Sequence, residues 1–182
     1  ELVRRFRLDR ADALRIAVLA VDPTRRRGGG ALLGDRIRMN ALDGGPVYFR
    51  SLATRGASSE LPDGLDDVVT AAKVAGYDLV IVETPGIGQG DAAIVDHCDV
   101  ALYVMTAEFG APSQLEKIDM LDFADAVAIN KFDRRGAEDA LREVRRQMRR
   151  NRTSFSADLE ALPVFGTVAS RFDDDGVTAL YQ

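Results

Sequence analysis

The sequence predicts a three-layer α/β fold built around a mostly parallel sheet. Six segments rich in apolar and β-branched residues indicate buried strands, at residues 15–21, 47–52, 78–84, 100–106, 124–130 and 162–168. Stretches of helical length lie between most of them, notably residues 65–75, 114–121 and 136–150. This alternation is typical of parallel strands joined by crossover helices, because two parallel strands need a long connection.

Length and composition agree with one soluble globular domain. The chain has 182 residues, of which 46% are apolar and 29% charged, and its net charge is −5. These values exclude a disordered or collagen-like chain, and no apolar run approaches the ~18 residues of a membrane helix. Cys98 is the only cysteine, so no internal disulfide can form, and the first residues lack a secretory leader pattern. We expect a cytoplasmic protein with no membrane and no nucleic-acid partner.

The first residues indicate that the sequence begins inside a helix, because Leu2, Val3, Phe6 and Leu8 recur at helical spacing. A phosphate-binding loop of the form GxxxxGK[ST] occurs nowhere in the 182 residues, although such a loop normally precedes a helix. We therefore expect residues 1–182 to be a single-domain fragment of a longer chain. The first strand and the phosphate loop are expected just upstream.

The strongest functional signal is the segment Asn130-Lys131-Phe132-Asp133, which follows the apolar residues 124–129. Ligands of open parallel sheets bind beyond the carboxyl ends of the strands, where this segment is expected. Its pattern, NKxD, is the one that GTPases use to read guanine. A carboxylate at Asp133 can accept hydrogen bonds from N1 and N2 of guanine, two donors that adenine does not present together. Lys131 would lie along the base and Asn130 would tie the loop together; the alternative is a polar turn after a buried strand.

A second signal is the strand at residues 78–84, which delivers Glu83 and then Gly86 to the same edge of the sheet. This pattern resembles a Walker B strand. A carboxylate there can hold the water shell of Mg²⁺, and a glycine lets its backbone N–H approach a terminal phosphate. The alternative is an ordinary strand end, since Pro85 and Gly86 are common turn residues.

Two further groups are expected near this edge. Asp22 and Asp35 flank the glycine-containing loop at residues 24–34 and are candidate Mg²⁺ ligands, although taken alone they are more ordinary as solvated carboxylates. The turn of small residues at 166–170 ends the last strand and supplies three candidate nucleotide contacts: Thr167, Val168 and Ala169. A metal site at His97 and Cys98 is not expected, because such sites need three or four ligands of this kind.

Longer stretches of the sequence resemble a known family. The sequences LLGDRIRM at residues 32–39 and ETPGIGQ at residues 83–89, together with the NKxD segment, resemble the GTPase chaperones of the MeaB/ArgK type, which serve adenosylcobalamin-dependent acyl-CoA mutases. The resemblance covers nearly the whole chain. Residues 114–125 and 134–140 are most similar to the fused isobutyryl-CoA mutases, in which the GTPase lies between a cobalamin domain and a substrate domain.

The resemblance implies a P-loop NTPase-like fold of the SIMIBI class and a GTPase that uses GTP, GDP and Mg²⁺. It implies metal roles for Asp22, Asp35 and Glu83, and catalytic roles for Glu83, Gly86 and Gln89. It also implies that nucleotide state is coupled to the loading and protection of adenosylcobalamin on an acyl-CoA mutase. The partners would be the cobalamin-binding and substrate-binding domains of that mutase, in the same chain or in a separate protein, and the parent would be a homodimer.

Other functions stay open at this point. A stand-alone GTPase of the MeaB/ArgK type would share these motifs. A metal-insertion GTPase would share the fold but usually displays more cysteine and histidine ligands than one of each. A non-catalytic interaction module would follow if the phosphate loop were truly absent. The sequence does not decide which acyl-CoA the parent would isomerise.

Overall fold

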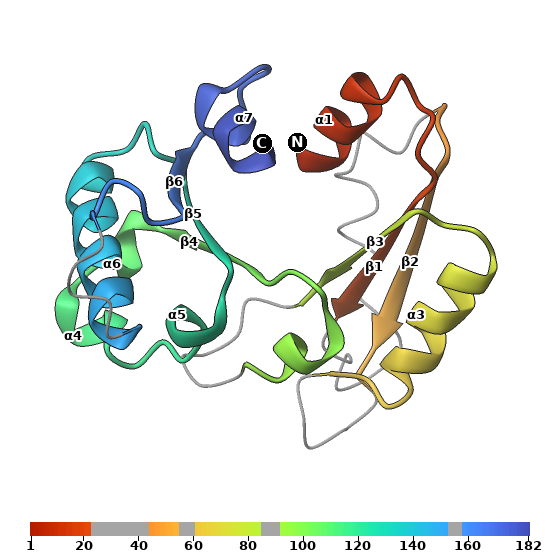
Figure 1. Cartoon of the computed structure of the whole chain (residues 1–182), viewed down its shortest axis with the longest axis horizontal. Coiled ribbons are helices and arrows are strands. Elements are labelled where there is room, and N and C mark those ends of the chain that lie inside the picture. Colours follow the sequence, from red (N-terminus) through yellow and green to blue (C-terminus); the bar gives the residue numbers. More distant parts are fainter. Residues whose placement is uncertain (23–43, 55–60, 85–91, 153–157) are drawn as a thin grey trace, which may run out of the picture. The chain divides into compact units, whose positions relative to one another are not determined.

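The computed structural model describes residues 1–22, 44–54, 61–84, 92–152 and 158–182 (Figure 1). It divides into two compact units, residues 2–87 and residues 88–182, which are here called the N-terminal and C-terminal units. Each unit contains a three-stranded parallel sheet. The parallel α/β fold predicted from the sequence is therefore confirmed, and all six predicted strands are present.

In the N-terminal unit the central strand is β1. The unit comprises α1 (Leu2–Asp9), β1 (Ile16–Asp22), β2 (Val47–Ala53), α3 (Leu65–Val74) and β3 (Leu79–Glu83). β1 pairs in parallel with both β2 and β3, and residues 16–21 are at most 2% exposed. Central parallel strands are covered on both faces, which explains why this segment is an unbroken apolar run. Val3 of α1 packs against β1, so the predicted opening helix is confirmed.

In the C-terminal unit the central strand is β5, which pairs in parallel with β4 and β6. The unit comprises η2 (Ala93–His97), β4 (Leu102–Thr106), η3 (Ala107–Phe109), α4 (Pro112–Leu115), α5 (Met120–Phe123), β5 (Ala126–Asn130), α6 (Ala137–Asn151), β6 (Val164–Thr167) and α7 (Asp175–Tyr181). Its core lies between the sheet and the helices α4, α5 and α6 (Figure 1). The carboxyl ends of β5 and β6 are adjacent because the strands are parallel and in register.

One side of α6 is apolar and packs on this core, while the other side is charged. Ala137, Val144 and Met148 are buried, and Leu141 packs at the margin of the core. Spacings of three and four residues place these side chains on one face of a helix. The packing of α6 against β5 and β6 fixes where the strand ends lie relative to the start of the helix.

The single helix predicted at residues 114–121 is wrong, because the structure has two short helices there, α4 and α5. Pro112 starts α4 earlier than predicted, since proline is well accommodated in the first turn of a helix. Between the helices, the amide of Ile118 bonds to the carbonyl of Leu115, three residues back, and the Ile118 side chain is buried. Leu115 of α4 and Met120 and Leu121 of α5 are also buried, so both short helices pack on the core.

Other differences from the sequence-based expectations are small. The strands begin and end within two residues of their predicted bounds. Cys98 is half-buried beside the core of the C-terminal unit, and this burial raises the pKa of its thiol. Over the described parts of the chain, no helix combines the length and the apolar character needed to cross a membrane.

Candidate functional site

The carboxyl ends of β5 and β6 bring two of the sequence-predicted groups together. Asn130 is the last residue of β5, Thr167 is the last residue of β6, and these two residues are directly paired in the sheet. The segment 130–133 and the segment 167–169 therefore leave the sheet side by side. Together they are here called the strand-end site.

Two hydrogen bonds join the segments of the strand-end site. The backbone N–H of Ala169 donates to the side-chain Oδ1 of Asn130 at 3.1 Å. The backbone N–H of Phe132 donates to the carbonyl of Thr167 at 3.0 Å. The role expected for Asn130, tying the loop together, therefore has a specific bond in the structure. Both bonds cross between segments that lie more than thirty residues apart in sequence, so they depend on the pairing of β5 with β6.

Close packing also holds the loop after β5 against β6. The ring of Phe132 lies directly over Gly166, where a Cβ atom would come within 2.5 Å of the ring carbons. Such a separation is far below van der Waals contact, so only glycine permits this approach. Phe132 is half-buried against the core of the C-terminal unit. Phe132, the second residue after β5, thus holds the loop against β6, while Lys131 and Asp133 on either side of it are exposed.

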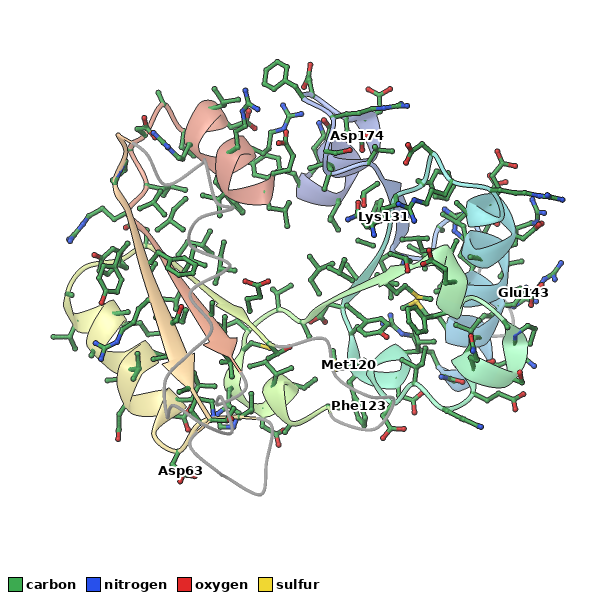
Figure 2. The ribbon with its side chains drawn as sticks, turned by 180° about the vertical axis from the view of Figure 1, so that it is seen from behind. Asp63, Met120, Phe123, Lys131, Glu143 and Asp174 are labelled. Carbon is green, nitrogen blue, oxygen red and sulfur yellow. The ribbon has the colours of Figure 1, made fainter. Side chains whose placement is uncertain are left out.

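Lys131 adopts a backbone conformation that is uncommon for a residue with a side chain. Its φ angle is +57°, in the left-handed region. The N–H of Arg134 bonds to the Lys131 carbonyl at 3.0 Å and closes a turn. The Lys131 side chain is exposed at the end of β5 (Figure 2). Backbone strain of this kind costs energy and persists where the surrounding structure imposes it.

Asp133 is exposed, and within the described residues it has no hydrogen-bond or ion-pair partner. A solvent-facing carboxylate without an internal partner can accept two hydrogen bonds from a ligand. This is the chemistry that the sequence assigned to Asp133.

Thr167 and Val168 are buried at 3% and 7% exposure, whereas Ala169 is exposed. Of these three residues Ala169 is the most exposed, while its backbone N–H is bonded to Asn130.

Sequence reasoning missed Asp174, whose side chain holds the turn after β6. Its Oδ2 atom accepts hydrogen bonds from the N–H of Val168 and the N–H of Val177, both at 3.0 Å. The second bond caps the N-terminus of α7, and the first holds the turn that follows β6 (Figure 2). A signal was available, because an aspartate just before a helix is a preferred cap. Three consecutive aspartates at 173–175 gave no reason to choose the middle one.

Beside Lys131 lies a hollow of about 300 Å³ at the ends of β4 and β5. Six residues surround it: Thr106, Ala107, Glu108, Lys131, Arg134 and Arg135. The Glu108 carboxylate accepts a hydrogen bond from the hydroxyl of Thr106, and it pairs with Arg134 at 3.4 Å. The Thr106 hydroxyl and the nearby cations hold the pKa of Glu108 below its usual value. Sequence analysis did not single out this carboxylate.

Of the remaining predicted residues, the structure describes Asp22 and Glu83, both in the N-terminal unit. Asp22 is the last residue of β1 and Glu83 is the last residue of β3, and these strands are parallel neighbours. Their ends therefore share one edge of that sheet. Asp35, Gly86 and Gln89 lie outside the described residues, as does the whole loop at 24–34. Within the described residues, no group of three or more acidic, histidine or cysteine side chains is placed to hold a metal ion.

Comparison with known proteins identifies the family. The sequence model of the family described as "Methylmalonyl Co-A mutase-associated GTPase MeaB" matches residues 2–182. A fused isobutyryl-CoA mutase from Nocardia farcinica is 74% identical over 182 residues, which is 100% of this chain and 17% of that protein. The corresponding protein from Cupriavidus metallidurans is 67% identical over 182 residues, again 100% of this chain and 17% of the relative. The chain thus spans about a sixth of the length of these relatives.

Solved structures agree on the fold. The nickel complex of HypB from Helicobacter pylori matches with a TM-score of 0.60 and 17% identity, over 98% of this chain and 73% of that one. HypB from Archaeoglobus fulgidus matches with a TM-score of 0.57 and 13% identity, over 99% of this chain and 79% of that one. At such low identity the likeness speaks to the fold alone. The full-length family match and the fused relatives go further: the chain belongs to the MeaB family of methylmalonyl-CoA mutase-associated GTPases.

Proposed function

We propose that this domain binds and hydrolyses GTP, and that its nucleotide state controls the loading and protection of adenosylcobalamin on an acyl-CoA mutase. The observation that carries the proposal is the strand-end site. There, Asn130 and Phe132 join the NKxD segment to the turn after β6, and Asp133 stays free for a ligand. Membership of the MeaB family supports the nucleotide, and the names of the fused relatives support the mutase.

In this proposal Asp133 selects guanine. Its two carboxylate oxygens accept from the N1 and N2 donors of the base, while adenine would leave one oxygen facing an acceptor. A buried or partly buried polar group left without a partner costs on the order of 1–3 kcal/mol, which is enough for strong discrimination. The aliphatic stem of Lys131 covers one face of the base. The backbone N–H groups of Val168 and Ala169 have protein partners, so the turn at 167–169 shapes the rim of the site.

Magnesium suits the donor set at the ends of β1 and β3. Asp22 and Glu83 are the last residues of adjacent parallel strands, and both residue types supply the hard carboxylate oxygens that Mg²⁺ prefers. We assign them, with Asp35, to the metal and its water shell; Mg²⁺ bound there would neutralise charge on the phosphates during transfer to water. Gly86 and Gln89 follow Glu83 in the chain and are assigned to sensing the terminal phosphate and to catalysis.

Because GxxxxGK[ST] does not occur in these 182 residues, we assign the phosphate loop and an additional strand to another part of the parent protein. Among the described strands, β3 and β4 are each at the edge of their sheet, so an added parallel strand has an unpaired edge available. A phosphate loop of this form is followed directly by a helix. Backbone amides at the N-terminus of that helix would hold the β- and γ-phosphates.

The mutase is assigned as the partner because of the relatives in which the two are joined. Fused isobutyryl-CoA mutases about six times longer than this chain contain a segment 74% identical to it. A mitochondrial protein of Caenorhabditis elegans named for methylmalonic aciduria type A is 34% identical over 65% of the chain and 29% of that protein. We therefore place the domain in a cytoplasmic, homodimeric fused isobutyryl-CoA mutase, in which the cobalamin-binding and substrate-binding domains are its partners.

Nucleotide titration of the full-length natural protein tests this proposal. With Mg²⁺ present, we expect GTP and GDP to bind at least a hundredfold more tightly than ATP and ADP, because only guanine satisfies both oxygens of Asp133. GTP turnover should require Mg²⁺, and it should change when adenosylcobalamin occupies the mutase. Equal affinity for adenine and guanine nucleotides would refute the assignment of the strand-end site. GTP turnover that is indifferent to the occupancy of the mutase would refute the coupling.

A further inference from the structure

The hollow beside Lys131 carries an unusual balance of charge. Three cationic side chains border it, from Lys131, Arg134 and Arg135, and one carboxylate, Glu108, faces them. The cations come from the loop after β5, whereas Glu108 comes from η3 after β4. Opposite charges on the loop after β5 and on η3, which follows β4, therefore meet at this hollow.

Glu108 is held by both of its oxygens. Oε2 accepts from the hydroxyl of Thr106, two residues earlier, and Oε1 faces Nη1 of Arg134 at 3.4 Å. The hydroxyl of Thr106 and the charges of Arg134 and Lys131 lower the pKa of this carboxyl. Both carboxylate oxygens of Glu108 thus have a partner, and Lys131 borders the same hollow.

Stability does not explain this arrangement. The side chains of Glu108 and Arg134 are 58% and 59% exposed, and exposed ion pairs contribute little to folding. What the pair does affect is the loop itself. The guanidinium of Arg134 pairs with Glu108, while the backbone N–H of Arg134 bonds to the carbonyl of Lys131, which has a φ angle of +57° and borders the hollow. Without a carboxylate, three positive charges would repel one another across the same small space.

We propose that Glu108 is a positioning residue for nucleotide binding: it holds Lys131 and Arg134 so that the stem of Lys131 is ready to cover the guanine base. The proposal rests on the proposed function of the strand-end site. Glu108 does not read the base; it reduces the disorder that Lys131 must lose when nucleotide binds. A preorganised contact improves affinity by removing such ordering costs.

The perturbation is Glu108→Gln, which keeps the size of the side chain and removes its charge. We expect the Kd for GDP and the KM for GTP to rise by up to about fivefold, the upper end of what exposed charge pairs provide. The rise should come mainly from faster dissociation, and kcat should fall by less than KM rises. The preference for GTP over XTP should persist, because Asp133 is intact. Glu116→Gln is the matched control, since Glu116 is exposed and does not border the hollow.

The experiment measures GDP dissociation from the full-length protein with a fluorescent GDP analogue, at low and high salt. For wild type, Glu108→Gln, Arg134→Gln and the double variant, positioning by charge predicts effects that are less than additive. It also predicts that the difference between wild type and Glu108→Gln shrinks as salt rises, because exposed charges are screened. A structural defect would not depend on salt in this way, and Glu108→Asp should recover part of the affinity.

The outcomes are distinguishable from failure of the proposed function. If wild type shows no preference for guanine nucleotides, the proposed function fails, and this inference fails with it. If wild type prefers guanine but Glu108→Gln dissociates GDP at the wild-type rate, Glu108 has no positioning role and the proposed function stands. Additive effects of the Glu108 and Arg134 changes, or a salt-independent difference, would also overturn the inference.

Discussion

Asp174 links α7 to the strand-end site, and replacing it with alanine should loosen both. One oxygen of this carboxylate accepts from the amides of Val168 and Val177, at 3.0 Å each. The first bond fixes the turn after β6, and the second caps α7. Because Val168 and Val177 are 7% and 3% exposed, amides that lose this partner are poorly placed to bond to water instead.

The expected magnitude follows from these two bonds. Loss of an N-terminal cap costs about 0.5–2 kcal/mol. Leaving a buried donor without a partner costs about 1–3 kcal/mol. Since one oxygen serves both donors, the costs are not fully additive, and we expect local opening to become easier by about 2–4 kcal/mol. At about 1.4 kcal/mol per factor of ten, amide exchange limited by this opening should accelerate roughly 30- to 700-fold.

Hydrogen–deuterium exchange on the full-length protein measures this effect in peptides covering residues 164–181. Asp174→Ala should accelerate exchange there and weaken GDP binding, because the turn at 167–169 is no longer held. Asp174→Asn retains an acceptor oxygen and should be milder. Asp175→Asn is the control, since Asp175 is exposed in the first turn of the same helix. Unchanged exchange in Asp174→Ala, or an equal effect of Asp175→Asn, would refute the role given to Asp174.

Three further predictions concern Gly166, Glu83 and the phosphate loop. Gly166→Ala should force the Phe132 ring away and destabilise the C-terminal unit by about 1–3 kcal/mol. Adding Phe132→Leu should recover part of the lost stability and of the lost GDP affinity. Denaturant melts measure the stability and GDP titration measures the affinity; a Gly166→Ala variant as stable as wild type contradicts the packing argument. Glu83→Ala should lower kcat for GTP and raise the Mg²⁺ concentration needed for half-maximal turnover, with less effect on GDP affinity; an unchanged Mg²⁺ profile would remove the metal assignment. The 182-residue polypeptide alone should bind GTP more weakly than micromolar, and a polypeptide extended upstream through the phosphate loop should bind orders of magnitude more tightly; calorimetry of both decides, and micromolar binding by the shorter one contradicts the assignment.

Much of the fold could be predicted from residue patterns. Buried parallel strands are covered on both faces, so they appear as apolar runs such as residues 16–21 and 126–129, and the runs were sufficient to find all six. The NKxD segment was recognised because it follows such a run. Its partner turn at 167–169 was also expected near it, since carboxyl ends of parallel strands lie at one edge of a sheet.

What could not be predicted depends on contacts between distant residues. The bond from Ala169 to Asn130 and the approach of Phe132 to Gly166 require the register of β5 against β6, which apolar runs do not specify. The roles of Asp174 and Glu108 depend on contacts with neighbouring elements, which only the three-dimensional structure shows. The break between α4 and α5 was missed because local helical spacing continues through residues 114–121: Leu115, Ile118 and Leu121 are all buried, as they would be on one side of a continuous helix.

The most direct test of the central claim is a change of base preference at Asp133. An asparagine there presents one acceptor and one donor, so Asp133→Asn should weaken GTP binding and favour xanthine nucleotides, whose C2 carbonyl accepts where guanine donates. We therefore propose titrating the full-length protein and its Asp133→Asn variant with GDP and XDP. If Asp133 reads guanine, wild type prefers GDP strongly and the Asp133→Asn variant reverses that preference. A variant that keeps wild-type GDP affinity and selectivity would contradict the claim that the strand-end site reads guanine.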